Sequence, residues 1–393
     1  MGSKTKGQQK GFPEFEPQTK KVLALDQKLF ELVNDIDILD AVAPTNYREQ
    51  SLAFFESRYS KAPEFQYKIH NIDAFSLKRK LFNLPIETIK DDDLRQLYLG
   101  VVDSYVDKID QYKSIGSAEF LYDSLRYYGE PSAKDIRNAH FILHLPDGMD
   151  GGDKLERIFK TNEIQKLLED FAQQEGYKFE IKIDNTMIAN ALVSGITVKI
   201  NSAAEVSETD AMALAHHELG VHLVTTLNAR SQPLKILSMG CPVNTMSQEG
   251  LAILAEYLAG CMTIKRLKIL ALRVLAVESM IKEKDFRSTF LLMKEKFQMP
   301  DAQAFTITAR VYRGGGFTKD YLYLQGFHQI LNAYENAENF NNLLAGKTSI
   351  DYLPILSRLI DKKILLPPQI ITPAFKKPVE NDGIRKFIAH AIK

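Results

Sequence analysis

The sequence holds little cysteine and no tryptophan. Two cysteines, Cys241 and Cys261, occur among 393 residues, and neither belongs to a CxxC pair. This scarcity excludes a disulfide scaffold and a cysteine-rich zinc site. Two isolated thiols in a chain of this length indicate a reducing compartment, and we expect both to be buried or half-buried.

The sequence also lacks an excess of charge of either sign, because fifty Lys plus Arg balance fifty Asp plus Glu. Binding to nucleic-acid phosphates usually shows as a basic excess, so nucleic acid is not expected as the main partner. The N-terminus is polar and does not look like a signal peptide. No stretch approaches the ~20 apolar residues that span a bilayer. We therefore expect a cytoplasmic protein that binds neither nucleic acid nor a membrane.

The chain does contain ordinary globular material, with 45% hydrophobic and 25% charged residues. This composition is sufficient for a sizeable core. The length exceeds that of one usual compact domain, which predicts one large domain or two closely joined ones. Apolar residues recur at helical spacing in the first third of the chain, which predicts helices from Thr19, after Thr45, over 92–113 and over 117–128.

Strand patterns follow in the middle of the chain. In YKFEIKID, residues 177–184, apolar and charged residues alternate strictly, which predicts a half-buried strand. GITVKIN, residues 195–201, is rich in β-branched residues and predicts a second strand, and the apolar run AHFILHLP, residues 139–146, suggests another. An exposed edge strand can pair with an extended peptide backbone through main-chain hydrogen bonds.

The most informative motif is HELGVH, which contains His217, Glu218 and His222. The familiar zinc-peptidase motif HExxH places its two histidines four residues apart, whereas these are five apart. Residues five apart on a regular helix are rotated by roughly 140°, too far to share one metal ion. A π-turn around residues 217–222 would return both histidines to one face, and Gly220 would ease this distortion. We therefore predict a π-turn that brings His217 and His222 together as metal ligands.

A third ligand is expected from the next helix, which begins near Ser247. Glu249 lies in its first turn and is our candidate, with Glu256 in reserve two turns later. Two imidazoles and one carboxylate favour zinc, with a fourth position open for water. Glu218 would then act as the general base that activates this water.

These patterns together predict an α+β fold, in which a mostly helical N-terminal part is joined to a gluzincin-like metallopeptidase domain with a small antiparallel sheet. We place a flexible tail, the helical region and the catalytic domain at residues 1–17, 18–135 and 136–393.

Other interpretations of these residues remain open at this point. A catalytically silent regulatory or binding protein could keep the fold and the metal, although it would have no physical need for Glu218. A non-haem iron oxygenase also uses two histidines and a carboxylate, but usually on a β-scaffold. His140 and His144 form a further pair, which we expect to be structural.

Three segments, HHELGVH, SQEGLA and RVYRGGGFTKD, resemble a known family over roughly residues 20–390. This is the family named for its QEGLA motif, called flavohaemoglobin-expression-modulating proteins in bacteria. Its animal members are the microtubule-associated tyrosine carboxypeptidases, which remove the C-terminal tyrosine of α-tubulin. The resemblance implies His217, His222 and Glu249 as zinc ligands and Glu218 as the base. It also implies a carboxypeptidase that trims the C-terminal tail of a peptide or protein.

The segment RVYRGGGFTKD offers groups that could bind a substrate carboxylate. Arg310 and Arg313 lie one turn apart on a helix that Gly314 can end. Thr318 could cap a new helix whose N-terminal amides, with Lys319 beside them, bind an anion. The alternative is that these cations pair with acidic groups and the glycines only turn the chain.

Two weaker candidates complete the predicted site. Tyr321, like Tyr323, could stabilise an oxyanion, although most tyrosines in such helices only pack. Asn244 could orient the site or the local backbone.

Overall fold

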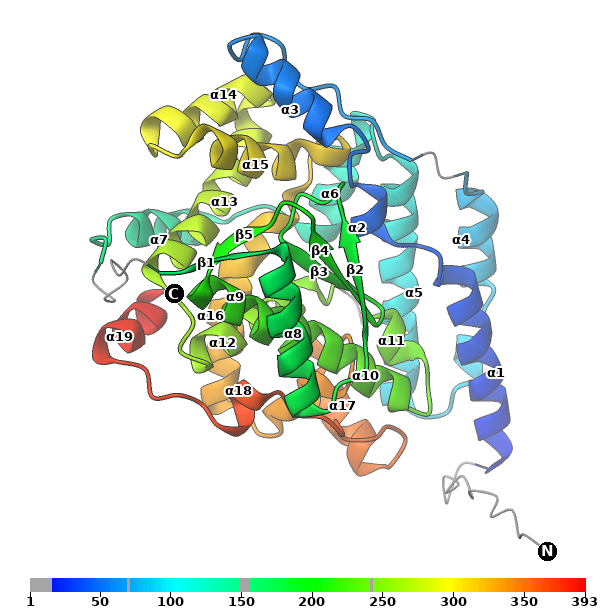
Figure 1. The fold of residues 1–393 in the computed structure, drawn as a ribbon. Coiled ribbons are helices and arrows are strands. Elements are labelled where there is room, and N and C mark those ends of the chain that lie inside the picture. Colours follow the sequence, from blue (N-terminus) through cyan, green and yellow to red (C-terminus); the bar gives the residue numbers. More distant parts are fainter. Residues whose placement is uncertain (1–15, 69–70, 149–155, 241–242) are drawn as a thin grey trace, which may run out of the picture.

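The computed structural model describes residues 16–68, 71–148, 156–240 and 243–393 of the chain. Helices predominate within these residues, and two small sheets lie among them near the centre of the molecule (Figure 1). The predicted α+β class is therefore confirmed. Nearly all of the predicted tail and Cys241 lie outside the described residues, whereas Cys261 is half-buried and free.

The N-terminal part of the chain is helical, as predicted. Asp91 begins one of its longest helices by accepting a hydrogen bond from the Leu94 amide at 3.0 Å, which satisfies a backbone donor in the first turn. The four helices expected in this part are present among α1 (Glu16–Val33), α2 (Ile38–Ala41), α3 (Tyr47–Glu56), α4 (Ala74–Phe82), the 3₁₀ turn η1 (Ile86–Thr88), α5 (Asp92–Lys113), α6 (Glu119–Tyr128) and α7 (Ala133–Leu143).

Helix α7 corrects one prediction, because the strand expected over residues 139–146 is wrong. Ser132 and Asp135 form a reciprocal capping box that starts a helix before the apolar run begins. From there Ala139 and Ile142 are buried at helical spacing. The prediction failed because it considered the apolar run without the capping residues in front of it.

The strands form two small sheets. In the larger one the order is β2 (Glu180–Asp184), β4 (Thr197–Asn201) and β3 (Ala191–Ser194). The β3–β4 pair is an antiparallel hairpin that turns at Gly195, where φ is +61°, whereas β2 runs parallel to β4. The smaller sheet pairs β1 (Ile158–Lys160) with β5 (Glu205–Ser207) in antiparallel fashion. The predicted antiparallel arrangement is thus correct for the β1–β5 and β3–β4 pairs. It is wrong for the β2–β4 pair, because β2 lies on the opposite side of β4 from β3 and runs in the same direction as β4.

Helices make up the rest of the described chain. Among the described residues, none is both long and apolar enough to cross a membrane. The segments before the predicted third ligand are α8 (Thr161–Glu175), α9 (Glu208–Leu214), the π-helix η2 (Ala215–Leu223), α10 (Val224–Ser231), α11 (Ile236–Met239) and α12 (Thr245–Leu258). Those after it are α13 (Ile264–Glu283), α14 (Phe286–Leu291), the π-helix η3 (Leu292–Lys296), α15 (Asp301–Tyr312), η4 (Arg313–Gly315), η5 (Thr318–Tyr321), α16 (Leu322–Asn336), η6 (Phe340–Ala345), η7 (Ile350–Tyr352), α17 (Leu353–Asp361), α18 (Pro373–Lys376) and α19 (Gly383–Ala391).

The hydrophobic cores join the N-terminal helices to the rest of the chain. Phe54 of α3 packs against Phe305 of α15 with tilted rings whose centroids lie 5.4 Å apart, and both belong to the largest core. The Tyr105 hydroxyl of α5 donates to the Met239 carbonyl at 2.8 Å. Residues from both sides of position 135 therefore share cores, and the domain boundary at that position stays a prediction.

Helix α12 is central to the largest core, because every residue from 247 to 258 is buried. It packs closely against α16 at a crossing of two glycines, Gly250 and Gly326. A Cβ atom on Gly250 would lie 2.4 Å from the Gly326 carbonyl oxygen, and one on Gly326 would lie 2.2 Å from the Met246 carbonyl oxygen. Both positions need glycine because backbone meets backbone there.

We predict that Gly250→Ala destabilises the fold, because an added methyl group must push α12 away from α16. Overpacking of a tight core typically costs roughly 1–3 kcal/mol in the free energy of unfolding, which chemical denaturation would measure. Gly383→Ala is the matched control, since a Cβ atom there meets nothing within 4 Å. Equal stabilities for the two variants would contradict the close crossing.

Candidate metal centre

The predicted π-turn is present and carries both histidines. The π-helix η2 covers residues 215–223 and joins α9 to α10 without a break. The rings of His217 and His222 come within 5.0 Å of each other, measured between centroids. His216 instead presents its ring to Phe171 of α8, with centroids 5.1 Å apart. The π-helix thus places His217 and His222 side by side although they are five residues apart in the sequence.

Gly220 has a second role within this turn. A Cβ atom there would lie 2.9 Å from the Thr372 hydroxyl oxygen. The glycine therefore leaves room for the C-terminal segment that packs against η2, in addition to easing the helical distortion.

Glu249 of α12 completes a group of three possible ligands. Its Oε2 atom lies 3.5 Å from His217 Nε2 and 3.7 Å from His222 Nε2. Ligand atoms of the three residues all lie within 4.8 Å of one another. Ligands bound at about 2.0–2.1 Å to a tetrahedral zinc ion lie roughly 3.4 Å apart. Glu249 Oε2 is also buried without a hydrogen-bond partner among the described groups, so the donor set and its spacing fit a zinc ion.

Glu218 lies beside this group and is buried. Its Oε2 atom has no hydrogen-bond partner within the described structure, and the nearby Val193 amide of β3 favours the ionised carboxylate. Burial raises the pKa of Glu218 to about 7, with the Glu249 charge adding to the rise and His217 opposing it. A carboxylate with a pKa near neutrality is well suited to accept and return a proton.

Lys319 contacts the third ligand instead of an open anion site. Its Nζ atom donates to Glu249 Oε1 at 2.6 Å and to the Tyr323 hydroxyl at 2.9 Å, and all three side chains are buried. Burial disfavours ionisation of Glu249, but Lys319 and the two histidines outweigh it and hold the Glu249 pKa well below its usual range. One carboxylate oxygen is thus fixed by Lys319 while the other faces the histidines.

Arg310 is also paired with an acidic group. Its Nε and Nη2 atoms donate to the two oxygens of Asp320 at 2.5 and 3.0 Å in a buried, two-point contact. Arg310 and Lys319 therefore pair with acidic side chains of the protein, which was the alternative to binding a substrate carboxylate.

The predicted helix cap at Thr318 is wrong. Thr318 begins the short 3₁₀ turn η5, and its side chain makes no cap hydrogen bond. Its amide and hydroxyl instead contact Ser124 of α6, because the segment packs against that helix. The Tyr321 hydroxyl donates to the Tyr128 carbonyl at 2.5 Å, so it is directed towards α6 as well.

Arg313 has a hydrogen-bond donor that is not used within the described residues. The structure shows the same for Arg273, which the sequence analysis did not name. The Nε atoms of both residues are buried and have no hydrogen-bond partner in the described part of the chain. Burial lowers the pKa of each to about 10, and the Arg310 charge contributes to both shifts. Arg273 was missed from the sequence, although an arginine within the apolar run LALRVLAV of α13 was a usable signal.

Asn244 lies at the start of α12, where its backbone carbonyl accepts from the Gln248 amide at 2.9 Å. Its side chain packs against Gly240, since a Cβ atom on that glycine would lie 2.5 Å from Asn244 Nδ2. Asn244 therefore lies next to Gly240, directly before the helix that carries Glu249.

Two residues near the histidines have roles that the sequence did not indicate. Glu256, the reserve ligand, bonds to His217 Nδ1 at 2.7 Å and is not part of the three-ligand group. Lys347 donates to the His222 carbonyl at 3.0 Å. Its position after Gly346 in a 3₁₀-rich segment gives no local signal of this contact.

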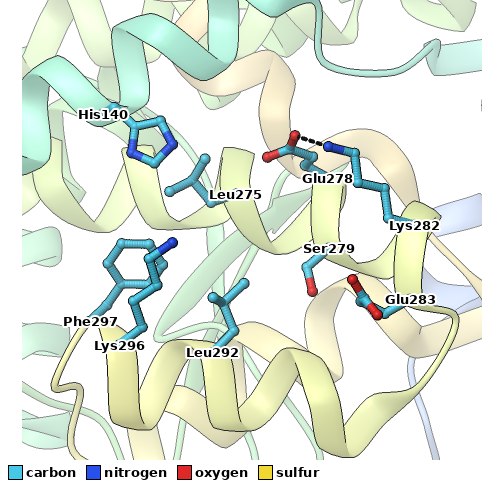
Figure 2. Close-up of a pocket in the computed structure, with 9 residues that line it drawn as sticks. All are labelled: His140, Leu275, Glu278, Ser279, Lys282, Glu283, Leu292, Lys296 and Phe297. Carbon is cyan, nitrogen blue, oxygen red and sulfur yellow. Dashed lines mark hydrogen bonds and ion pairs between the residues drawn. The ribbon is translucent and has the colours of Figure 1, made fainter.

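A separate cavity of about 180 Å³ lies between α7, α13 and η3 (Figure 2). His140 and Leu275 face each other on one side of it, and the ion pair of Lys282 with Glu278 lies on another. Its lining includes none of the predicted ligand or substrate-binding residues.

Comparison with known families gives one match. The family model described as microtubule-associated tyrosine carboxypeptidase matches residues 52–393. No individual curated protein matches the chain.

We predict that Lys319→Met destabilises the metal-free protein, because Glu249 would then be buried without its cation. Removing one partner of a buried pair typically costs about 3–5 kcal/mol. Added zinc should recover part of the loss, since a bound cation would again neutralise the carboxylate. Thermal unfolding with and without zinc would measure both effects.

The control for this substitution is Lys282→Met, which breaks the exposed pair with Glu278. This variant should unfold at the parent temperature with or without zinc. A Lys319→Met protein that also unfolds at the parent temperature would contradict the role given to Lys319.

Proposed function

The chain belongs to the microtubule-associated tyrosine carboxypeptidase family, and from that premise we propose a zinc-dependent carboxypeptidase that trims C-terminal residues of peptides or proteins. The observation that carries this proposal is the convergence of two imidazoles and one unpartnered carboxylate oxygen beside the buried carboxylate of Glu218. Family membership supports the carboxypeptidase-like class, and the site supports the metal-dependent mechanism within it.

The zinc ion would be held by His217, His222 and Glu249 Oε2. When bound, zinc supplies Lewis-acid chemistry, which makes water more acidic and polarises a carbonyl group. Ligands drawn from a His-Glu-His helix and from the helix that follows favour the gluzincin-like assignment of this domain.

Glu218 would act as the proton carrier of the reaction. It neighbours a ligand in sequence but keeps one oxygen free of hydrogen bonds among the described residues. The nearby Val193 amide favours the ionised form of this carboxylate. Glu218 would take the proton of the attacking water and deliver it to the leaving amine of the cleaved bond.

Strand β3 supports a way of binding the substrate backbone. It is an edge of the larger sheet in the described structure and packs against η2. An extended peptide could add alongside β3 through main-chain hydrogen bonds, which do not depend on its side chains. Such a peptide would lie next to Glu218, because Val193 of β3 contacts that carboxylate.

The substrate carboxylate is best assigned to Arg313, with Arg273 as a second donor. Arg310 and Lys319 already have acidic partners, whereas the Nε atoms of Arg313 and Arg273 lack any among the described groups. A guanidinium binds a carboxylate through charge-assisted hydrogen bonds. This assignment keeps Arg313 from the predicted set and replaces the other two cations.

We predict that Glu218→Gln keeps the metal and loses the activity, because the amide cannot accept a proton. The native chain should contain about one zinc ion by mass spectrometry. The variant should contain the same amount, while kcat falls by roughly 10²–10⁴-fold.

His217→Ala and Glu249→Ala serve as controls for this experiment, since both should lose the metal as well as the activity. A native chain that takes up no zinc would overturn the mechanism. Zinc binding without cleavage of any tested peptide would favour a binding protein.

We further predict a preference for free C-terminal carboxylates over amides. A hydrogen bond to a charged group contributes about 1.5–3 kcal/mol, so amidation should lower kcat/KM by roughly 10–100-fold. Arg313→Gln should reduce this preference, whereas Arg137→Gln on the exposed face of α7 should preserve it. Equal cleavage of both peptides by the native chain would indicate an endopeptidase.

A further inference from the structure

The buried Glu256 and the half-buried Arg266 form an ion pair directly behind His217. Glu256 is 1% exposed. Its Oε1 atom accepts from His217 Nδ1 at 2.7 Å and from Arg266 Nη2 at 2.9 Å. Its Oε2 atom accepts from Arg266 Nε at 3.0 Å. Both oxygens are therefore occupied, which explains why this carboxylate is absent from the ligand group.

The fold constructs this arrangement from two consecutive helices. Glu249 and Glu256 lie seven residues apart on α12, so they share one face of that helix. The chain then reverses at Gly260, where φ is +74°. Thr263 caps α13 by accepting from the Arg266 amide at 3.0 Å, which fixes Arg266 at the start of the returning helix.

The hydrogen bond determines which nitrogen of His217 can bind a metal. A carboxylate held by arginine can only accept, so His217 Nδ1 must carry the proton. In the neutral ring, the form that binds a metal, the lone pair is then on Nε2, the atom that lies 3.5 Å from Glu249 Oε2. Glu256 thus selects the tautomer and restrains the plane of the ring.

If Glu256 and Arg266 served only the stability of the fold, the hydrogen bond from His217 to Glu256 would not affect metal binding. Buried ion pairs are weak contributors to stability, because desolvation offsets their attraction. What distinguishes this pair is that a third member, His217, is itself a candidate ligand.

We propose that Glu256 and Arg266 are positioning residues. Arg266 orients Glu256, and Glu256 fixes the tautomer and the ring plane of His217 for binding the metal ion. This inference rests on the proposed function, because it concerns the same metal centre. Hydrogen-bond partners behind a ligand typically change metal affinity by 10–100-fold when they are removed.

The test is Glu256→Asp, which keeps the negative charge beside Arg266 but shortens the side chain so that it no longer reaches His217. Zinc affinity would be measured by chelator competition. The coordination geometry of the metal would be followed by the visible absorption bands of the cobalt-substituted protein. We expect a 10–100-fold weaker zinc affinity and altered cobalt bands. Glu278→Asp, which shortens a carboxylate paired with Lys282 on α13, is the matched control and should change neither.

Arg266→Lys is a second variant that tests the same inference if Glu256→Asp does not fold. It keeps a cation beside Glu256 but removes the two-point contact, so a smaller loss of zinc affinity with shifted cobalt bands is expected. Zinc affinity within twofold of the native value and unchanged cobalt bands in the folded variants would overturn the positioning role alone. Failure of the native chain to bind zinc would overturn the metal centre itself.

Discussion

The site depends on one constraint: a charge placed inside a protein must be paired, hydrogen-bonded or bound to a metal. Three buried carboxylates around η2 and α16 meet it with basic partners. Glu249 has Lys319, Glu256 has Arg266 and His217, and Asp320 has Arg310. Each partner lies on a different turn or helix, so the charges also fix how these elements sit together.

Among the described groups, only one of the two carboxylate oxygens of Glu249 is paired, and the unpaired oxygen indicates what else the site could bind. Lys319 occupies Oε1, while Oε2 is left buried and without a hydrogen bond within the described structure. An orphaned charged oxygen costs free energy unless another group can use it. Its position next to two imidazole nitrogens supports the proposal that a metal cation would satisfy it.

Helix packing brings the three ligands together. The contact of Gly250 with Gly326 allows α12 to lie close against α16, and α12 also packs against η2. Lys319 precedes α16 in η5, so the same crossing delivers the cation to Glu249. In the SQEGLA segment, Gly250 therefore allows the close packing of α12 on α16, while Glu249 before it is the candidate ligand.

Local geometry explains what could be predicted from the sequence. The five-residue spacing of HELGVH required a π-turn for a shared metal, and η2 has that form. Glu249 followed from the expected position of the next helix. The strand at 139–146 failed for an equally local reason, since the capping box of Ser132 and Asp135 was not considered.

Side-chain pairing across the fold could not be predicted in the same way. Lys319 and Glu249 are distant in sequence, and only the packing of α16 on α12 makes them neighbours. Arg310 is different, because its partner Asp320 lies within the segment that suggested an anion site. The presence of that aspartate was a usable signal that one arginine was already neutralised.

The balance of charge near the candidate ligands bears on what the site can accept. Six basic and four acidic side chains are buried or half-buried there, and three of the basic ones, Arg266, Arg273 and Lys347, are only half-buried. The basic group comprises Arg266, Arg273, Arg310, Arg313, Lys319 and Lys347, and the acidic group comprises Glu218, Glu249, Glu256 and Asp320.

A bound divalent metal would increase this positive excess further. Excess charge of one sign in a low-dielectric region attracts a counter-charge. Bare peptide backbone carries none, whereas the end of a chain carries a carboxylate. Arg273 and Arg313, whose Nε atoms make no hydrogen bond among the described residues, would therefore favour a chain terminus over an internal segment of polypeptide.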